Sequence, residues 1–230
     1  SVSSALDAAY NRPPYEGDKP LRVVHRDIKP SNIMVDGSGL TKVLDFGVAR
    51  AEFDEREAKT QELSFGSVDY MAPERLFFEP ETPLSDVYGL GATLYEFIAL
   101  QKFGKSKLSQ EKQEAFVGER FEDLLERHPM ASEEVEDLLH DLLYDMLSFQ
   151  KSERPTAAQC VTRMRRFARS LKSQPTSEEW AESVIPPLVE EISGHAPSPV
   201  GRDTTSMVGR ILVEDTVGFG ELQADAAEEL

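Results

Sequence analysis

Two short runs of strand-forming residues, Ile33–Val35 and Leu40–Leu44, flank the turn sequence DGSG and predict a β-hairpin. A hairpin brings the residue before its first strand and the residue after its second strand to the same end. Asn32 and Asp45 hold these two positions. An amide oxygen and a carboxylate side by side are hard oxygen ligands, which favour Mg²⁺ over zinc. The hairpin therefore predicts a magnesium site at its open end.

The eight residues that lead into the hairpin, HRDIKPSN, supply further charges that such a site would use. Asp27 is a candidate general base, and Lys29 is a point charge suited to phosphate. Protein-bound Mg²⁺ usually shares its shell with substrate phosphates, so a base, a cation and two metal ligands together indicate phosphoryl transfer. The alternative is a polar surface loop beside a hairpin, which accounts for each residue separately but not for their joint spacing.

The sequence HRDIKPSN is followed by DFG at Asp45–Gly47 and by APE at Ala72–Glu74, in the order and at the spacing of the protein kinases. From Ala5 to Leu171 the chain resembles the large, C-terminal lobe of a eukaryotic-type (Hanks-type) serine/threonine protein kinase, and its motifs are most similar to those of bacterial members. The resemblance implies a mainly α fold, helical with a small β-hairpin at the catalytic loop. It also implies ATP and Mg²⁺, or Mn²⁺, as cofactors.

Four residues match the family's catalytic positions. Asp27 would accept the proton of the substrate hydroxyl group. Lys29 would bind and stabilise the transferred phosphoryl group of ATP, and a lysine there resembles the serine/threonine class rather than the tyrosine kinases. Asn32 and Asp45 would bind the metal and, through it, the nucleotide.

Five further residues match structural or regulatory positions of the family. His25 would brace the catalytic loop, and Asp86 would anchor that loop from a central helix. Glu74 and Arg154 would form a buried ion pair, in which the loss of one partner costs on the order of 3–5 kcal/mol. Arg26 would receive a phosphate from the activation loop, and the alternative for it is an ordinary surface ion pair.

Residues 51–65 are polar and acidic without a clear period, which predicts a long surface loop. Thr60 and Ser64 lie in this stretch and are either activation-loop phosphorylation sites or solvated hydroxyl groups, and the sequence leaves both interpretations open. Ser67 stands where the family often has threonine. The resemblance implies that Ser67 helps to shape the loop on the substrate side.

Helical patterns dominate the rest of the lobe. The opening SSALDAAY predicts the end of a helix, and residues 84–100 are apolar nearly all round, which predicts a buried central helix. Residues 132–147 and 156–171 are amphipathic and predict two more helices. Thr156 and Gln159 have the spacing of a capping box at the start of the second one.

The composition changes after Lys172, which predicts a kinase lobe over residues 1–172 and an acidic, mostly disordered tail over 173–230. More than half of the formal net charge of −17 lies in this tail. Residues 176–185 predict a short helix, which Pro186 and Pro187 should end or kink. From Gly194 onward the composition predicts disorder.

The charge and the resemblance limit the partners. A net charge of −17 argues against nucleic acid, and no apolar run reaches the roughly 20 residues of a membrane span. The resemblance implies ATP, protein substrates with Ser or Thr, and a cytoplasmic location or the cytoplasmic part of a membrane-anchored kinase. In the tail, Thr204, Thr205 and Thr216 could be read by a phosphothreonine-binding module, or the tail could be an unmodified acidic linker.

A protein kinase also has a smaller N-terminal lobe with a Gly-rich loop, a strand lysine and a helix glutamate. The two dozen or so residues before His25 are too few for such a lobe. Two hypotheses follow. The chain is the catalytic lobe of an active kinase whose N-terminal lobe lies upstream of Ser1, or it is a catalytically inactive, kinase-like scaffold or interaction module. We expect the isolated 230 residues to have negligible activity, because half of the nucleotide site is absent from them.

Overall fold

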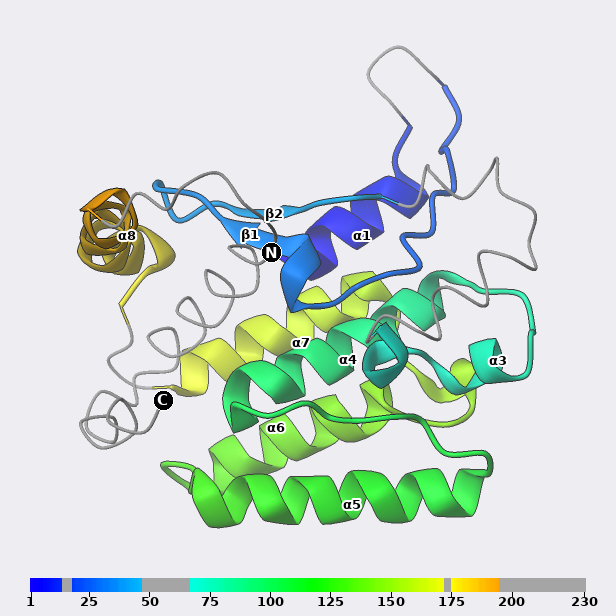
Figure 1. Ribbon diagram of the computed structural model, residues 1–230. Coiled ribbons are helices and arrows are strands. Elements are labelled where there is room, and N and C mark those ends of the chain that lie inside the picture. The colour runs from blue at the N-terminus through cyan, green and yellow to red at the C-terminus, as the bar shows by residue number, and fades with distance from the viewer. Residues whose placement is uncertain (14–17, 47–66, 172–174, 195–230) are drawn as a thin grey trace.

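The computed structural model describes residues 1–13, 18–46, 67–171 and 175–194. The fold is mainly α, as predicted, with one two-stranded antiparallel sheet in the described residues (Figure 1). The elements follow one another in this order: α1 (Val2–Asn11), η1 (Pro30–Asn32), β1 (Ile33–Val35), β2 (Thr41–Val43), η3 (Ser67–Tyr70), α3 (Pro73–Leu76), α4 (Pro83–Ala99), α5 (Gln110–Arg127), α6 (Glu133–Met146), η4 (Lys151–Glu153), α7 (Ala157–Ser170) and α8 (Ser177–Gly194).

Helix α4 lies at the centre of the molecule and contacts α1, α5, α6 and α7 (Figure 1). It is buried on all sides because it is apolar nearly all round, as the sequence predicted. Two apolar clusters meet at this helix. One is shared mainly with α5 and α6 and includes Tyr88, Tyr95, Phe103, Val117 and Leu139. The other lies toward α1 and α7 and includes Leu6, Ile28, Val87, Leu90 and Cys160.

The two amphipathic helices predicted at 132–147 and 156–171 are present as α6 and α7. The capping box predicted at the start of α7 is confirmed. The backbone N–H of Thr156 donates to Oε1 of Gln159 (2.7 Å), and the N–H of Gln159 donates to Oγ1 of Thr156 (3.3 Å). Both donors are N–H groups that a helix start leaves without a partner, which explains why the helix begins there.

Helix α5 has no counterpart in the sequence prediction. Its buried residues are Gln113, Val117, Phe121 and Leu124, about one residue per turn. This apolar stripe is narrow and begins with a glutamine, and most of the surrounding residues are charged. The sequence therefore shows only a weak helical periodicity here. Gln113 is accommodated because its amide nitrogen donates to the hydroxyl group of Tyr88 (3.0 Å) and to the carbonyl oxygen of Leu147 (3.1 Å).

The predicted hairpin is confirmed, with Ile33 opposite Val43 and Val35 opposite Thr41. The second strand is shorter than the predicted Leu40–Leu44. The turn is closed by Asp36, whose Oδ1 accepts hydrogen bonds from the backbone N–H groups of Ser38 (3.0 Å) and Leu40 (3.1 Å). The hairpin lies against α1 on one side of the helical layer (Figure 1).

Helix α8 is longer than the short helix predicted at 176–185, because it runs through Pro186 and Pro187. Of the two effects expected from the prolines, the end of the helix is wrong, and a kink stays a prediction. Proline fixes φ near the helical value, and its cost lies in the lost N–H donor and in crowding of the preceding turn, so a helix can continue through it. The disorder predicted after Gly194 concerns residues outside the described ranges, and the domain boundary at 172 stays a prediction.

The first turns of α8 lie against the hairpin turn (Figure 1). A Cβ atom on Gly39 would come within 2.2 Å of the carbonyl oxygen of Ser177, so only glycine fits there. Trp180 and Ala181 are both buried. Among the described residues, no helix is long and apolar enough to cross a membrane.

Candidate active site

His25 connects the loop that carries Asp27 to the segment that carries Asp45. Its buried ring donates a hydrogen bond from Nε2 to the carbonyl oxygen of Leu44 (2.8 Å), and its Nδ1 accepts one from the backbone N–H of Asp27 (3.2 Å). These two contacts select the tautomer with the proton on Nε2. The ring also packs edge-on against Phe46, with 4.8 Å between the centroids. His25 thus joins the Asp27 loop to the chain on both sides of Asp45.

Asp86 holds the same loop from helix α4. Its two carboxylate oxygens accept hydrogen bonds from the backbone N–H groups of His25 and Arg26, both at 2.7 Å. Only 4% of Asp86 is exposed. Burial raises the pKa of Asp86 to about 6, although the two N–H donors act in the opposite direction.

Two residues of the site have left-handed backbones. The φ angle is 73° at Arg26 and 54° at Asp45. Residues other than glycine rarely adopt this conformation, and each instance costs on the order of 1–3 kcal/mol. Such strain gathers at functional sites, and here it falls on the residue before Asp27 and on a predicted metal ligand.

Asp27, Lys29 and Asn32 lie together, as their joint spacing suggested. Oδ2 of Asp27 is 2.9 Å from Nζ of Lys29 and accepts a hydrogen bond of 3.0 Å from Nδ2 of Asn32. The same Nδ2 donates to the carbonyl oxygen of Asp27 (2.7 Å). The 3₁₀ turn η1 produces this arrangement by folding Asn32 back over the loop. The carboxylate of Asp27 is therefore held on one side by an ammonium and an amide.

Asn32 and Asp45 both offer oxygen atoms for a cation. The N–H of Leu44 donates to the carbonyl oxygen of Asn32 (2.8 Å), which places Asp45 beside Asn32 at the open end of the hairpin. Neither Oδ1 of Asn32 nor the carboxylate of Asp45 has a hydrogen bond or ion pair with a described residue. The described residues contain no group of three or more His, Cys, Asp or Glu side chains suited to a metal. A site with these two oxygen donors fits Mg²⁺, which completes its shell with water and phosphate.

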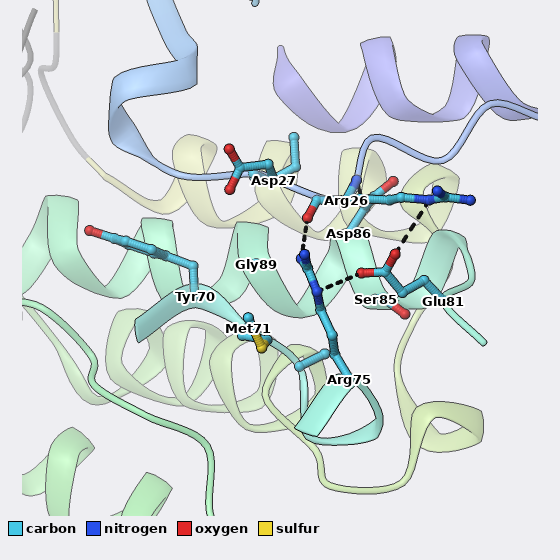
Figure 2. Close-up of a pocket in the computed structure, with 11 residues that line it drawn as sticks. Arg26, Asp27, Tyr70, Met71, Arg75, Glu81, Ser85, Asp86 and Gly89 are labelled. Atoms are coloured by element: carbon cyan, nitrogen blue, oxygen red, sulfur yellow. Dashed lines mark hydrogen bonds and ion pairs between the residues drawn. The ribbon is translucent and has the colours of Figure 1, made fainter. Parts of the chain in front are cut away.

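The side chain of Arg26 forms an ion pair with Glu81, with 3.3 Å between Nε and Oε2 (Figure 2). The other oxygen of Glu81 lies 3.0 Å from Nε of Arg75. Arg75 also donates from Nη1 to the carbonyl oxygen of Arg26 (2.6 Å). Arg75 and Glu81 could not be predicted from the sequence, because no local pattern marks their contacts with Arg26, which is about 50 positions away in the chain. Together with Asp27 and Asp86, these residues line a small cavity.

Glu74 and Arg154 form a buried ion pair with two parallel hydrogen bonds of 2.8 Å. The three remaining N–H groups of Arg154 donate to the carbonyl oxygens of Ser148, Leu84 and Phe149. Burial alone would raise the pKa of Glu74, but Arg154 and a hydrogen bond from Ser85 hold it below its usual range. The pair connects α3 to the segment before α7.

The structure describes little of the three regulatory candidates on the activation-loop side. Thr60 and Ser64 lie outside the described residues, as does Gly47 of the DFG sequence. Ser67 begins η3, and only its backbone is described. The proposed roles of these residues stay predictions.

Comparisons with known proteins show which family the chain is similar to. The profile of the family described as "Protein kinase domain" matches residues 19–164. The chain is 44% identical over 77 residues to a probable serine/threonine-protein kinase of Corynebacterium efficiens, and 48% identical over 86 residues to the MAP kinase kinase mkk-4 of Caenorhabditis elegans. It is 42% identical over 77 residues to the serine/threonine-protein kinase PknB of Mycobacterium tuberculosis.

These alignments cover 33%, 37% and 33% of this chain, respectively. They cover 12%, 23% and 12% of the three relatives. The chain therefore spans a small part of the curated relatives that it matches. The motifs HRD, DFG and APE all fall inside the residues that the family profile matches.

Proposed function

The chain belongs to the protein kinase domain family, and from this premise we propose that it forms the catalytic lobe of a serine/threonine protein kinase. The reaction is transfer of the γ-phosphoryl group of ATP to Ser or Thr hydroxyl groups of protein substrates. One observation carries the proposal. The carboxylate of Asp27 is bound by Lys29 and Asn32, and Asn32 lies beside the hairpin end that carries Asp45, whose oxygens have no partner among the described residues.

In this proposal the four side chains have different roles. Asp27 accepts the proton of the attacking hydroxyl group, and its Oδ2 is paired with Lys29 and Asn32. Lys29 places a positive charge beside the transferred phosphoryl group. Asn32 fixes the loop through its amide nitrogen and offers Oδ1, together with Asp45, to Mg²⁺. Bound Mg²⁺ supplies neutralisation of the phosphate charges.

An apolar side chain on the hairpin supports the proposal that a second lobe covers this face. Met34 follows Asn32 by two residues and is 37% exposed. An exposed apolar group beside a nucleotide site is suited to packing against a base or another domain. We therefore propose that activity requires a small lobe over the hairpin, and that the isolated 230 residues are inactive.

The test is phosphoryl transfer by the natural full-length protein, measured with labelled ATP, Mg²⁺ and a mixture of protein substrates. The matched control is Asp27→Asn, which keeps the size of the side chain and removes the base. We expect the wild type to label serine and threonine at least about a hundredfold faster than the variant, the scale of general-base catalysis. A wild type that is no faster than Asp27→Asn would refute the proposal and leave the scaffold hypothesis.

A further inference from the structure

Two arginine side chains from different segments converge on one carboxylate beside the catalytic loop (Figure 2). Arg26 belongs to the loop, Arg75 to α3, and Glu81 to the connection between α3 and α4. Each oxygen of Glu81 pairs with one of the two guanidinium groups, at 3.3 Å and 3.0 Å. The carboxylate therefore bridges the two cations.

The bridge is partly shielded from solvent. The side chains of Arg75 and Glu81 are 17% and 16% exposed, and that of Arg26 is 45% exposed. Salt screens such a pair less than a pair on the open surface. Without Glu81, two positive charges would face the same small space and repel each other. The carboxylate thus offsets the repulsion between the two guanidinium groups.

Arg75 extends this bridge to the backbone of the catalytic loop. Its Nη1 donates to the carbonyl oxygen of Arg26 at 2.6 Å, while the N–H of Arg26 donates to Asp86. The backbone N–H and the carbonyl oxygen of Arg26 are therefore both hydrogen-bonded. These contacts help to maintain its φ of 73°, because such a strained conformation persists only where the surrounding structure stabilises it. The peptide unit after this carbonyl leads directly to Asp27. Arg75, which is paired with Glu81, therefore helps to hold the peptide unit that leads to Asp27.

We propose that Glu81 is a positioning residue that serves as a resident counter-ion for Arg26 and Arg75, so that the catalytic loop is in place without a phosphate on the activation loop. This inference rests on the proposed function, and it specifies how that site is regulated. The family resemblance gives a phosphate the task of neutralising Arg26. Here a carboxylate of the chain itself forms an ion pair with Arg26.

The experiment uses the full-length protein after phosphatase treatment and compares three variants. Glu81→Ala removes the bridging carboxylate, and Arg75→Ala removes its partner. Glu79→Ala is the matched control, because Glu79 lies in the same connection but pairs with Lys151 at 3.2 Å. We expect untreated and phosphatase-treated wild type to have similar kcat values. We expect Glu81→Ala and Arg75→Ala to lower kcat at least about tenfold, with the KM for ATP changed less than about twofold, because a misplaced base affects the chemical step.

Chemical rescue separates positioning from a general loss of structure. Added formate or acetate can enter the space left by Glu81→Ala and pair with the two guanidinium groups, so we expect it to restore part of the lost kcat. The same anions should not rescue Arg75→Ala and should not affect Glu79→Ala. A Glu81→Ala variant that is as active as the wild type, or more active, would overturn the inference. Loss of wild-type activity on phosphatase treatment would overturn it as well.

A second measurement keeps the inference separate from the proposed function. If the wild type shows no phosphoryl transfer at all, the proposed function fails, and hydrogen exchange decides the role of Glu81. We expect Glu81→Ala to increase amide exchange in the segment 22–29, and formate to reverse the increase. Unchanged exchange in that segment would overturn the inference independently of activity.

Discussion

The carboxylate of Asp86 accepts a hydrogen bond of 2.7 Å from the backbone N–H of His25, the first residue of the HRD sequence. Its other oxygen accepts one of 2.7 Å from Arg26. Helix α4, which is largely buried, therefore holds two consecutive N–H groups of the catalytic loop with one carboxylate. Because this carboxyl group is buried, its contribution to stability depends on pH.

The pKa of Asp86 is about 6 in the folded protein and 3.8 for the unperturbed group, so the folded state binds the proton more tightly than the unfolded chain. This group therefore makes the folded state more stable as the pH falls from about 6 to about 4, and less stable as the pH rises through the same window. We expect Asp86→Asn to remove this dependence. As the pH rises from about 4 to about 6, the free energy of unfolding of the wild type should fall relative to that of the variant. The difference should be about 1 kcal/mol per pH unit.

Urea unfolding at several pH values between about 4 and 6 measures this slope. Asp141→Asn is the control, because the Asp141 side chain is 73% exposed. The control should run parallel to the wild type. If the curves of wild type and Asp86→Asn are also parallel, the buried carboxyl group does not have the raised pKa assigned to it.

Arg154 and Glu74 give a second prediction, which concerns stability alone. All five N–H groups of Arg154 have acceptors, so Arg154→Ala leaves the Glu74 carboxylate buried without its cation. We expect a loss of about 3–5 kcal/mol in the free energy of unfolding. For comparison, Lys151→Ala breaks an exposed pair with Glu79 and should cost less than about 1 kcal/mol. Equal losses in urea unfolding would contradict the role of burial.

A third prediction separates metal binding from folding. Asp45 makes no hydrogen bond or ion pair with a described residue, and asparagine tolerates its left-handed backbone better than most residues do. We therefore expect Asp45→Asn to change the free energy of unfolding by less than about 0.5 kcal/mol. In the full-length protein the same change should abolish Mg²⁺-dependent phosphoryl transfer. A variant with normal Mg²⁺ dependence would remove Asp45 from the metal site.

Local chemistry explains which parts of the site could be predicted from the sequence. Asn32 and Asp45 are separated only by a hairpin, and the turn residues around Asp36 determine that hairpin over a few positions. The capping box of α7 is local in the same way. These features depend on neighbours in the chain, so the pattern alone predicts them.

The parts that could not be predicted depend on packing between distant segments. Arg75 reaches the carbonyl oxygen of Arg26 only because α3 and the catalytic loop both pack on α4, and no spacing rule marks that contact. Helix α5 was missed for a related reason. Its buried Gln113 makes sense only when Tyr88 and Leu147 are in place around it. Helix α8 continued through two prolines that local rules treat as breakers.

The turn of the hairpin gives the last prediction, because two glycines in it have opposite surroundings. A Cβ atom on Gly39 would meet the backbone of Ser177 at the start of α8, and its φ of 77° disfavours any other residue. A Cβ atom on Gly37 would meet nothing within 4 Å. We expect Gly39→Ala to lower the free energy of unfolding by at least about 1 kcal/mol, whereas Gly37→Ala should stay within about 0.5 kcal/mol of the wild type.

The same pair of variants reports whether α8 belongs to the folded lobe. If α8 is held against the hairpin by the contact at Gly39 and by the buried Trp180, then Gly39→Ala should increase hydrogen exchange in residues 177–185 as well as in the turn. Gly37→Ala should leave that helix protected. Equal exchange of α8 in both variants would mean that the helix does not depend on the hairpin for its stability. An increase limited to Gly39→Ala would mean that the segment after residue 175 is coupled to the strands that carry Asn32 and Asp45.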